Sequence, residues 1–87
     1  MKKTIVGITV VGKDREGVVA QFTNFVFQNN GNVEKVNQNV IKGLFGMYLE
    51  VSFTSKINFK QLDSGLQKLS KKLRMEVSTH YEINTEK

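Results

Sequence analysis

The chain has 87 residues, of which 39% are hydrophobic and 24% charged, and its formal net charge at pH 7 is +5. A chain of this length can form one domain with a modest core, so a large enzyme pocket is not expected. Because it has no cysteine and one histidine, disulfides, cysteine nucleophiles, thiolate metal sites and multi-histidine metal sites are excluded, and we expect no metal and no other cofactor.

The first predicted element is a strand. Residues 5–11 form an apolar, β-branched run, and its alternation places three residues on one face: Val6, Ile8 and Val10. The preceding Met-Lys-Lys-Thr resembles the start of a signal peptide, but the apolar run is short and alternates with Gly7 and Thr9 as a strand does. No segment reaches the apolar length of a membrane span. We therefore expect a cytoplasmic protein with no membrane partner.

A helix and a more polar strand follow. In residues 18–28 the apolar side chains recur at helical spacing, and Asn29-Asn30-Gly31 is expected to end the helix, since Asn and Gly tolerate the left-handed conformation of C-caps. Residues 33–41 then alternate as a strand with valines on one face and asparagines on the other: Val36 and Val40 against Asn37 and Asn39. Its polarity predicts an edge strand.

The second half of the chain repeats this order. Residues 44–53 alternate strictly, and their apolar members share one face. Asn58 is expected to cap a second helix, with Gln61 at the capping-box position. The helix carries an apolar stripe of Leu62, Leu66, Leu69 and Leu73. Residues 75–83 alternate as a last strand.

The predicted order is β-α-β-β-α-β, and no proline interrupts any element. Two such halves with right-handed crossovers give an α+β fold, the ferredoxin-like sandwich, in which two helices cover one face of a four-stranded antiparallel sheet. We expect a single domain over residues 4–83. The other sheet face and the polar strand at residues 33–41 are left available to a partner.

This fold carries many unrelated functions, so the sites must decide between them. A copper chaperone of this topology needs a cysteine pair, and an acylphosphatase-like enzyme needs an arginine in the helix at residues 18–28, which holds no basic residue. His80 has the polar neighbours Ser78 and Glu82 at strand spacing but no nucleophile with a matching base, so a surface histidine is expected. The sequence predicts no enzyme.

Nucleic acid is a class of partner that the positive charge suggests. RNA-recognition modules of this topology stack bases on aromatic residues of the open sheet face, but only Tyr48 is expected there, because Phe45 and Phe53 share the covered face. Basic residues near the end of the second helix favour its dipole and are typical of a solvated surface: Lys68, Lys71, Lys72 and Arg74. We expect no nucleic-acid partner. The alternative function is a protein- or nucleic-acid-binding adaptor that uses the open face or this basic end without a small-molecule ligand.

Residues 12–19, GKDREGVV, join the first strand to the first helix and hold four charged residues between two glycines. In a purely structural role, Asp14 caps the helix, Glu16 favours the positive end of its dipole, and Gly17 lets the first turn pack tightly. In a binding role, the same turn exposes backbone N–H donors to a carboxylate or phosphate, while Asp14 holds an ammonium group. This corner could thus bind both ends of a free amino acid.

Residues 10–40, VVGKDREGVVAQFTNFVFQNNGNVEKVNQNV, resemble the ACT domain family. Its members carry a strand, an Asp/Asn-Arg-Pro-Gly-Val/Ile-type turn, a helix, and a Gly-x-Asn-Ile element that opens the second strand. The matching pieces here are Asp14-Arg15-Glu16-Gly17-Val18 and Gly31-Asn32-Val33, with Glu16 in place of the usual proline and no spacer before Asn32. Gln38 also stands where small single-domain members and the glycine-cleavage repressor group often have glutamine. The resemblance covers nearly the whole chain.

The resemblance implies a regulatory rather than a catalytic protein. ACT domains usually bind amino acids or other small metabolites and form dimers, with the ligand between the first loop of one subunit and the start of the second strand of its neighbour. The implied partners are therefore a small amino acid or metabolite, a second copy of the chain in a homodimer or higher homo-oligomer through the polar edge strand, and a separate regulated protein. The implied ligand-binding residues are Lys13, Asp14, Arg15, Gly17, Val18, Val19, Asn32 and Val33, with Asp14 and Asn32 as polar contacts and residues 17–19 as backbone donors.

Overall fold

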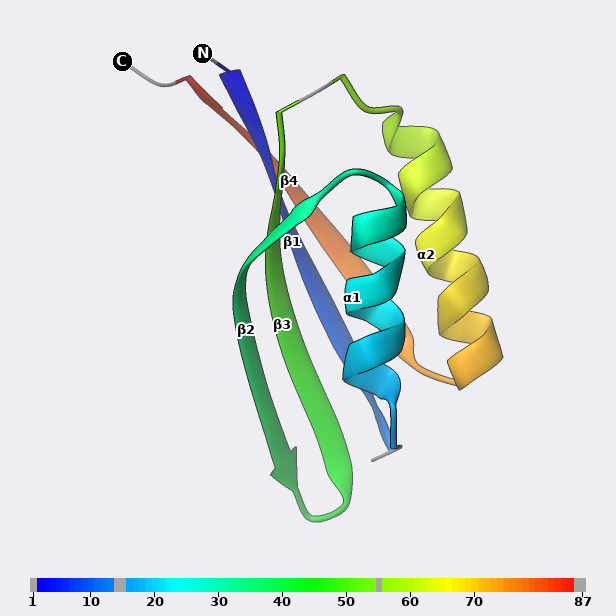
Figure 1. Cartoon of the computed structure of the whole chain (residues 1–87). Coiled ribbons are helices and arrows are strands. Elements are labelled where there is room, and N and C mark those ends of the chain that lie inside the picture. The colour runs from blue at the N-terminus through cyan, green and yellow to red at the C-terminus, as the bar shows by residue number, and fades with distance from the viewer. Residues whose placement is uncertain (1, 14–15, 55, 86–87) are drawn as a thin grey trace.

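A computed structural model describes residues 2–13, 16–54 and 56–85 of the chain. Its helices and strands follow the predicted order: β1 (Lys2–Lys13), α1 (Val18–Gln28), β2 (Asn32–Ile41), β3 (Leu44–Phe53), α2 (Phe59–Leu73) and β4 (Glu76–Thr85). The strands form one antiparallel sheet in the order β2-β3-β1-β4, and both helices lie on one of its faces (Figure 1). The predicted ferredoxin-like fold is therefore confirmed.

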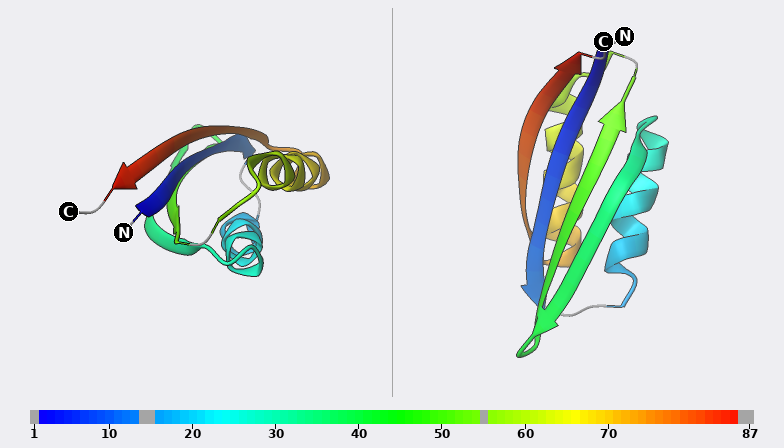
Figure 2. Two further views of the ribbon diagram at one scale, coloured as in Figure 1. Left: turned by 90° about the horizontal axis from the view of Figure 1, so that it is seen from above. Right: turned by 90° about the vertical axis from the view of Figure 1, so that its left-hand side faces the viewer.

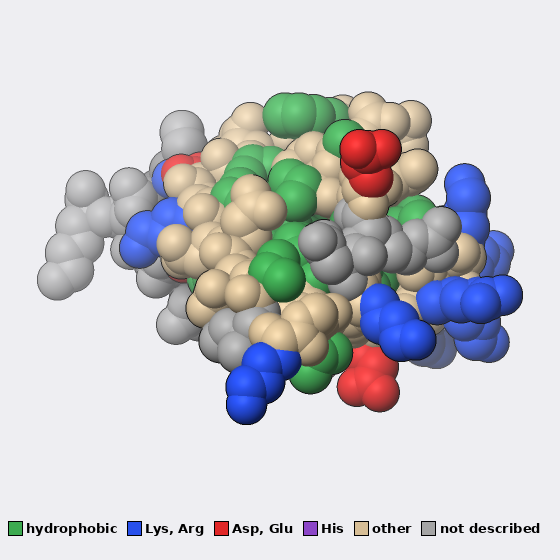
Figure 3. Space-filling view, turned by 90° about the horizontal axis from the view of Figure 1, so that it is seen from below, with side chains coloured by type: hydrophobic (Ala, Val, Ile, Leu, Met, Phe, Trp, Pro, Cys, Tyr) green, Lys and Arg blue, Asp and Glu red, His purple; other side chains and the backbone are tan. Residues whose placement is uncertain are grey.

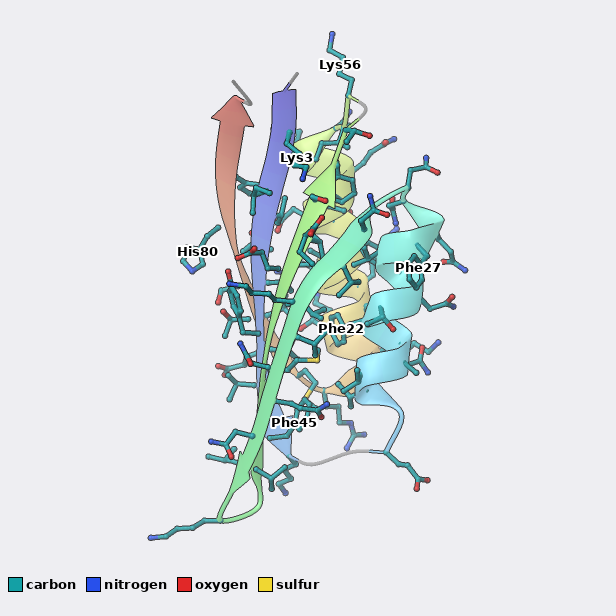
Figure 4. The ribbon with its side chains drawn as sticks, turned by 60° about the vertical axis from the view of Figure 1, so that its left-hand side comes forward. Lys3, Phe22, Phe27, Phe45, Lys56 and His80 are labelled. Carbon is teal, nitrogen blue, oxygen red and sulfur yellow. The ribbon has the colours of Figure 1, made fainter. Side chains whose placement is uncertain are left out.

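The core lies between the sheet and the two helices. The central strands β1 and β3 each have one apolar face, because their apolar side chains alternate along the strand. As predicted, this is the face that lies against the helices. Phe22 points from α1 toward the sheet (Figure 4). The buried apolar residues are Val6, Ile8, Val10, Val18, Phe22, Val26, Phe45, Met47, Leu49, Val51, Phe53, Leu62, Leu66, Leu73 and Met75.

The start of α1 differs from the prediction. Its N-cap is Gly17 and not Asp14, which lies outside the described residues. Gly17 has a left-handed φ of 85°, which a residue without a Cβ adopts at little cost. Among the described residues, no atom lies within 4 Å of the place where a Cβ would be. The glycine therefore serves the backbone turn and not the tight packing expected from the sequence.

The other predicted helix ends are confirmed. Asn29 and Asn30 end α1, with Asn30 at a φ of 65° and the N–H of Gly31 donating to the carbonyl oxygen of Val26 at 2.9 Å. Asn58 caps α2, because its Oδ1 accepts a hydrogen bond of 3.1 Å from the N–H of Gln61. Both caps come from short local patterns, which is why the sequence alone could place them.

Candidate functional site

The end of β1 and the start of α1 lie at the end of the molecule that also holds the β2–β3 hairpin and the turn into β4 (Figure 1). Lys13, at the end of β1, is exposed, whereas Asp14 and Arg15 lie outside the described residues. Gly12 packs against the turn before β4, since a Cβ at Gly12 would overlap Met75 Sδ and lie 3.3 Å from the carbonyl oxygen of Arg74. A segment far along the chain therefore supports the end of β1.

Gly17, Val18 and Val19 present backbone rather than side chains. The side chain of Val18 is buried and that of Val19 half-buried, and both pack in the core. Their N–H groups belong to the start of α1, where the N–H of Gln21 is the donor to Gly17 O, at 3.0 Å. As the N-cap, Gly17 has no side chain that could accept from the N–H groups of the first helical turn that follows it. The first turn of α1 is therefore suited to bind the oxygens of an anion.

Asn32 and Val33 lie at the other end of α1. Asn32 is exposed at the first position of β2, and Val33 is half-buried against the core. At about 1.5 Å per residue, the 11 residues of α1 separate Gly17 from Asn32 by about 16 Å along the helix axis. A single chain therefore does not bring the two halves of the predicted site together.

The start of β2 carries a feature that sequence reasoning missed. The register of β2 against β3 shifts between Val33 and Lys35, which makes Glu34 a bulge residue. The hydroxyl of Ser52 on β3 is buried and donates to Glu34 Oε2 at 2.6 Å. This hydrogen bond holds the start of β2, and with it Asn32, against β3. The sequence does not indicate this hydrogen bond, because Ser52 stands at a position of the strand that points away from the helices and is expected to face solvent.

The flank formed by β2 and α1 is a second surface, of which the sequence predicted the edge of β2 but not the part that α1 contributes. In the described part of the chain, β2 has a strand on one side only (Figure 2). Val36 and Val40 are 39% and 50% exposed, although they share the face of the core. Helix α1 has no charged residue, and its Phe27 is 61% exposed on the outer side (Figure 4). Apart from Glu34 and Lys35 at the start of β2, this flank is uncharged and partly apolar, as protein interfaces often are.

His80 and Tyr48 lie on the face of the sheet that the helices do not cover. His80 is exposed and lies opposite Gly7 in the register of β1 and β4. Within residues 2–13, 16–54 and 56–85, no three His, Asp or Glu side chains are close enough to hold a metal ion. Tyr48 packs across Gly7, where a Cβ would come within 2.9 Å of its hydroxyl oxygen. The tyrosine ring therefore fills a gap in the sheet surface.

The basic end of α2 has a local explanation. Figure 3 shows Lys and Arg side chains gathered over the C-terminal end of this helix, and Lys71 and Lys72 belong to its last turn. Cations at that position interact favourably with the negative end of the helix dipole.

Of the helices in the described ranges, none is both long and apolar enough to cross a bilayer.

Known proteins are similar to this chain in sequence and in fold. A family model of the ACT domain matches residues 4–80. A UPF0237 protein of Methanococcus maripaludis is 35% identical over 77 residues, which cover 86% of this chain and 84% of that protein. The structure of an ACT domain protein from Streptococcus pneumoniae has a TM-score of 0.83 at 27% identity, over 90% of this chain and 89% of that one. A candidate glycine cleavage system transcriptional repressor shares the fold, with a TM-score of 0.88 at 22% identity over 97% of this chain and 49% of that one.

Proposed function

The chain belongs to the ACT domain family, and from that premise we propose that it is a non-catalytic regulatory module that binds a small amino acid or related metabolite at the interface of a homodimer. The proposal includes a single domain over residues 4–83, a cytoplasmic location and no enzymatic activity. The protein that responds to the bound ligand is a separate partner.

The observation that supports a site shared between subunits is the separation of its two halves. The backbone donors of Gly17, Val18 and Val19 lie at one end of α1, and Asn32 lies at the other end. A small ligand that contacts both halves must therefore contact two chains. The unpaired edge of β2, next to the uncharged helix α1, offers a surface on which a second copy can pack.

The residues of the two halves suit a free amino acid. The N–H groups at the positive end of α1 bind its carboxylate. Asp14, assigned from the sequence alone, accepts from its ammonium group, and Asn32 of the partner subunit adds an amide that can donate or accept. Val33 of the partner subunit contributes apolar contact to a short side chain.

Charged residues around the loop modulate this site. Lys13 is exposed beside it, and with Arg15, assigned from the sequence, it attracts an anionic group. Glu16 is exposed just before α1 and places a carboxylate near the helix end where a ligand carboxylate would bind. Glu16 therefore weakens binding of simple amino acids relative to a proline at that position.

A screen of the standard amino acids by thermal shift, followed by calorimetry of each hit, tests the proposal. A ligand present at about 100 times its dissociation constant would stabilise the folded state by about 2.7 kcal/mol. Asn32→Ala removes one hydrogen bond and is expected to weaken binding about fivefold, by about 1 kcal/mol. Gln67→Ala, which removes an exposed amide on α2, is the control and should leave affinity unchanged. A screen in which no amino acid raises the thermal midpoint would contradict amino-acid binding.

A further inference from the structure

We propose that the open face of the sheet docks an extended acidic segment of another protein. A bulky apolar side chain of that segment enters a hollow above Gly46, and its carboxylates meet Lys13 and Lys42. The identity of the other protein as the regulated partner rests on the proposed function, whereas the docking site rests on the sheet face alone.

Two glycines of the central strands lie on the open face, and one of them is uncovered. Gly7 on β1 lies under Tyr48, since an added Cβ would be 2.9 Å from the tyrosine hydroxyl oxygen. At Gly46 on β3, the described atom nearest to an added Cβ, apart from its chain neighbours, is the carbonyl oxygen of Asn39 at 4.0 Å. The chain therefore fills one gap with its own side chain and leaves the other open.

A hollow of about 450 Å³ opens above the uncovered glycine. Val11 on β1 and Leu44 on β3 line it, and they are 39% and 55% exposed. The hollow continues along β2 into a second one, which is lined by Asn37, Asn39 and Tyr48. Because burial of exposed apolar surface is favourable, the apolar walls favour an apolar side chain of a partner.

The shape and the polar groups of the hollow suit an extended segment. The hollow is broad and open, whereas sites for small molecules enclose most of the ligand. Asn37 and Asn39 are exposed on the same face of β2, about 6.6 Å apart, which is also the interval at which an extended segment repeats its peptide groups on one side. Their amides can donate and accept, so both can bind peptide groups. Such a segment lies on the face of the sheet and leaves the edge of β2 unpaired.

The charges around the hollow favour an acidic partner. Lys42 lines the hollow at the hairpin, and Lys13 lies opposite Leu44 in the register of β1 and β3. Both lysines are exposed, whereas Glu76 is exposed opposite Val11 on β4. Carboxylates of a partner therefore bind on the hairpin side of the hollow. Figure 3, which looks onto this end of the molecule, shows exposed hydrophobic side chains together with Lys and Arg side chains.

A synthetic peptide, acetyl-SGFSDDE-amide, is the probe, because it combines one phenylalanine with acidic residues. Titration of the isotope-labelled chain, followed by nuclear magnetic resonance, measures its binding. We expect the amide signals of Val11, Leu44 and Gly46 to shift, with a dissociation constant on the order of 1 mM, and those of Gly17 and Asn32 to stay in place. Alanine in place of the phenylalanine should weaken binding at least about tenfold.

Gly46→Val fills the hollow from within. Gly46 has no positive φ, its Cβ position is open, and strands favour valine, so this variant is expected to keep the fold. We expect it to bind the peptide at least about tenfold more weakly, since the phenylalanine loses its place. Ser78→Val is the matched control: it adds the same side chain on the same face, on β4 and outside the hollow, and should leave affinity unchanged.

The role of the lysines is tested separately. Lys42→Gln is expected to weaken peptide binding about threefold and to make it less sensitive to salt, because exposed charge pairs contribute modestly and are screened. Lys56→Gln is the matched control, since Lys56 is exposed at the opposite end of the molecule (Figure 4). It should leave both affinity and salt dependence as in the wild type.

Several results would overturn the docking site: no shift at Gly46 at peptide concentrations above the expected dissociation constant, Gly46→Val binding as tightly as the wild type, or phenylacetate binding as tightly as the peptide. A Gly46 signal that shifts with protein concentration alone would also overturn it, in favour of a second copy of the chain. Amino-acid binding by a chain that does not bind the peptide would leave the proposed function standing. Peptide binding by a chain that binds no amino acid would keep the docking site and remove its link to regulation.

Discussion

Gly31 joins the end of α1 to the start of β2, and alanine at this position tests how tightly Asn32 is held. An added Cβ would lie 2.7 Å from Phe53 Cε1 and 2.8 Å from Val26 Cγ1, and both of these side chains are buried. Overpacking of this kind costs about 1–3 kcal/mol. Alanine also restricts the unfolded chain, which offsets about 0.4–1 kcal/mol. We therefore expect Gly31→Ala to lower the free energy of unfolding by about 1–2 kcal/mol.

Urea denaturation at one fixed protein concentration measures this change, since the stability of the proposed dimer would depend on concentration. Gly46→Ala is the matched control, because neither glycine has a positive φ and the closest contact of the added Cβ at Gly46 is the carbonyl oxygen of Asn39 at 4.0 Å. We expect this control to raise the free energy of unfolding by about 0.4–1 kcal/mol. Equal effects of the two substitutions would refute the reasoning, because they would show that the side chains beside Gly31 can move to accommodate a Cβ without loss of stability.

Three further substitutions test other local contacts. In a helix, alanine is favoured over glycine by about 1 kcal/mol, but Gly65→Ala in α2 is expected to lose this gain, because its Cβ would lie 2.7 Å from Phe25 Cε1. The gain should return when Phe25→Leu removes that contact. Urea denaturation of the wild type, the two single variants and the double variant measures the coupling. Arg74→Gly should raise the free energy of unfolding by about 1 kcal/mol, seen as a higher thermal midpoint, since Arg74 holds a left-handed φ of 57°. Asn58→Ala should lower it by about 1 kcal/mol in the same assay, because the N–H of Gln61 loses its acceptor; no change would contradict the cap.

The parts of the fold with strong local patterns could be predicted from the sequence. Strand β3 has the same bounds as the prediction, residues 44–53, because its alternation is strict and Lys42-Gly43 supplies a turn before it. The cap at Asn58 and the end of α1 at Asn29 depend on a few neighbouring residues in the same way. In each case the necessary information lies in residues that are close together in the sequence.

The parts that depend on the path of the chain in space could not be predicted. Asp14 and Gly17 both suit the start of a helix, and the choice between them follows from the φ of Gly17. The hydrogen bond between Ser52 and Glu34 joins residues 18 positions apart through a bulge that no local pattern marks. The candidate site residues and their division between two subunits were expected from the resemblance to a family, whereas no local pattern of the chain itself indicates that Gly17 and Asn32 lie at opposite ends of α1.

The position of Gly17 and Asn32 at opposite ends of α1 has a genetic consequence. In the dimer that we propose, each site would take Gly17 from one subunit and Asn32 from the other. Two alleles, one defective at Gly17 and the other at Asn32, each produce homodimers without a complete site. When both alleles are expressed together, the mixed dimer collects both defects in one site and leaves the other site whole. The proposed site therefore predicts that two inactive alleles of this chain complement each other.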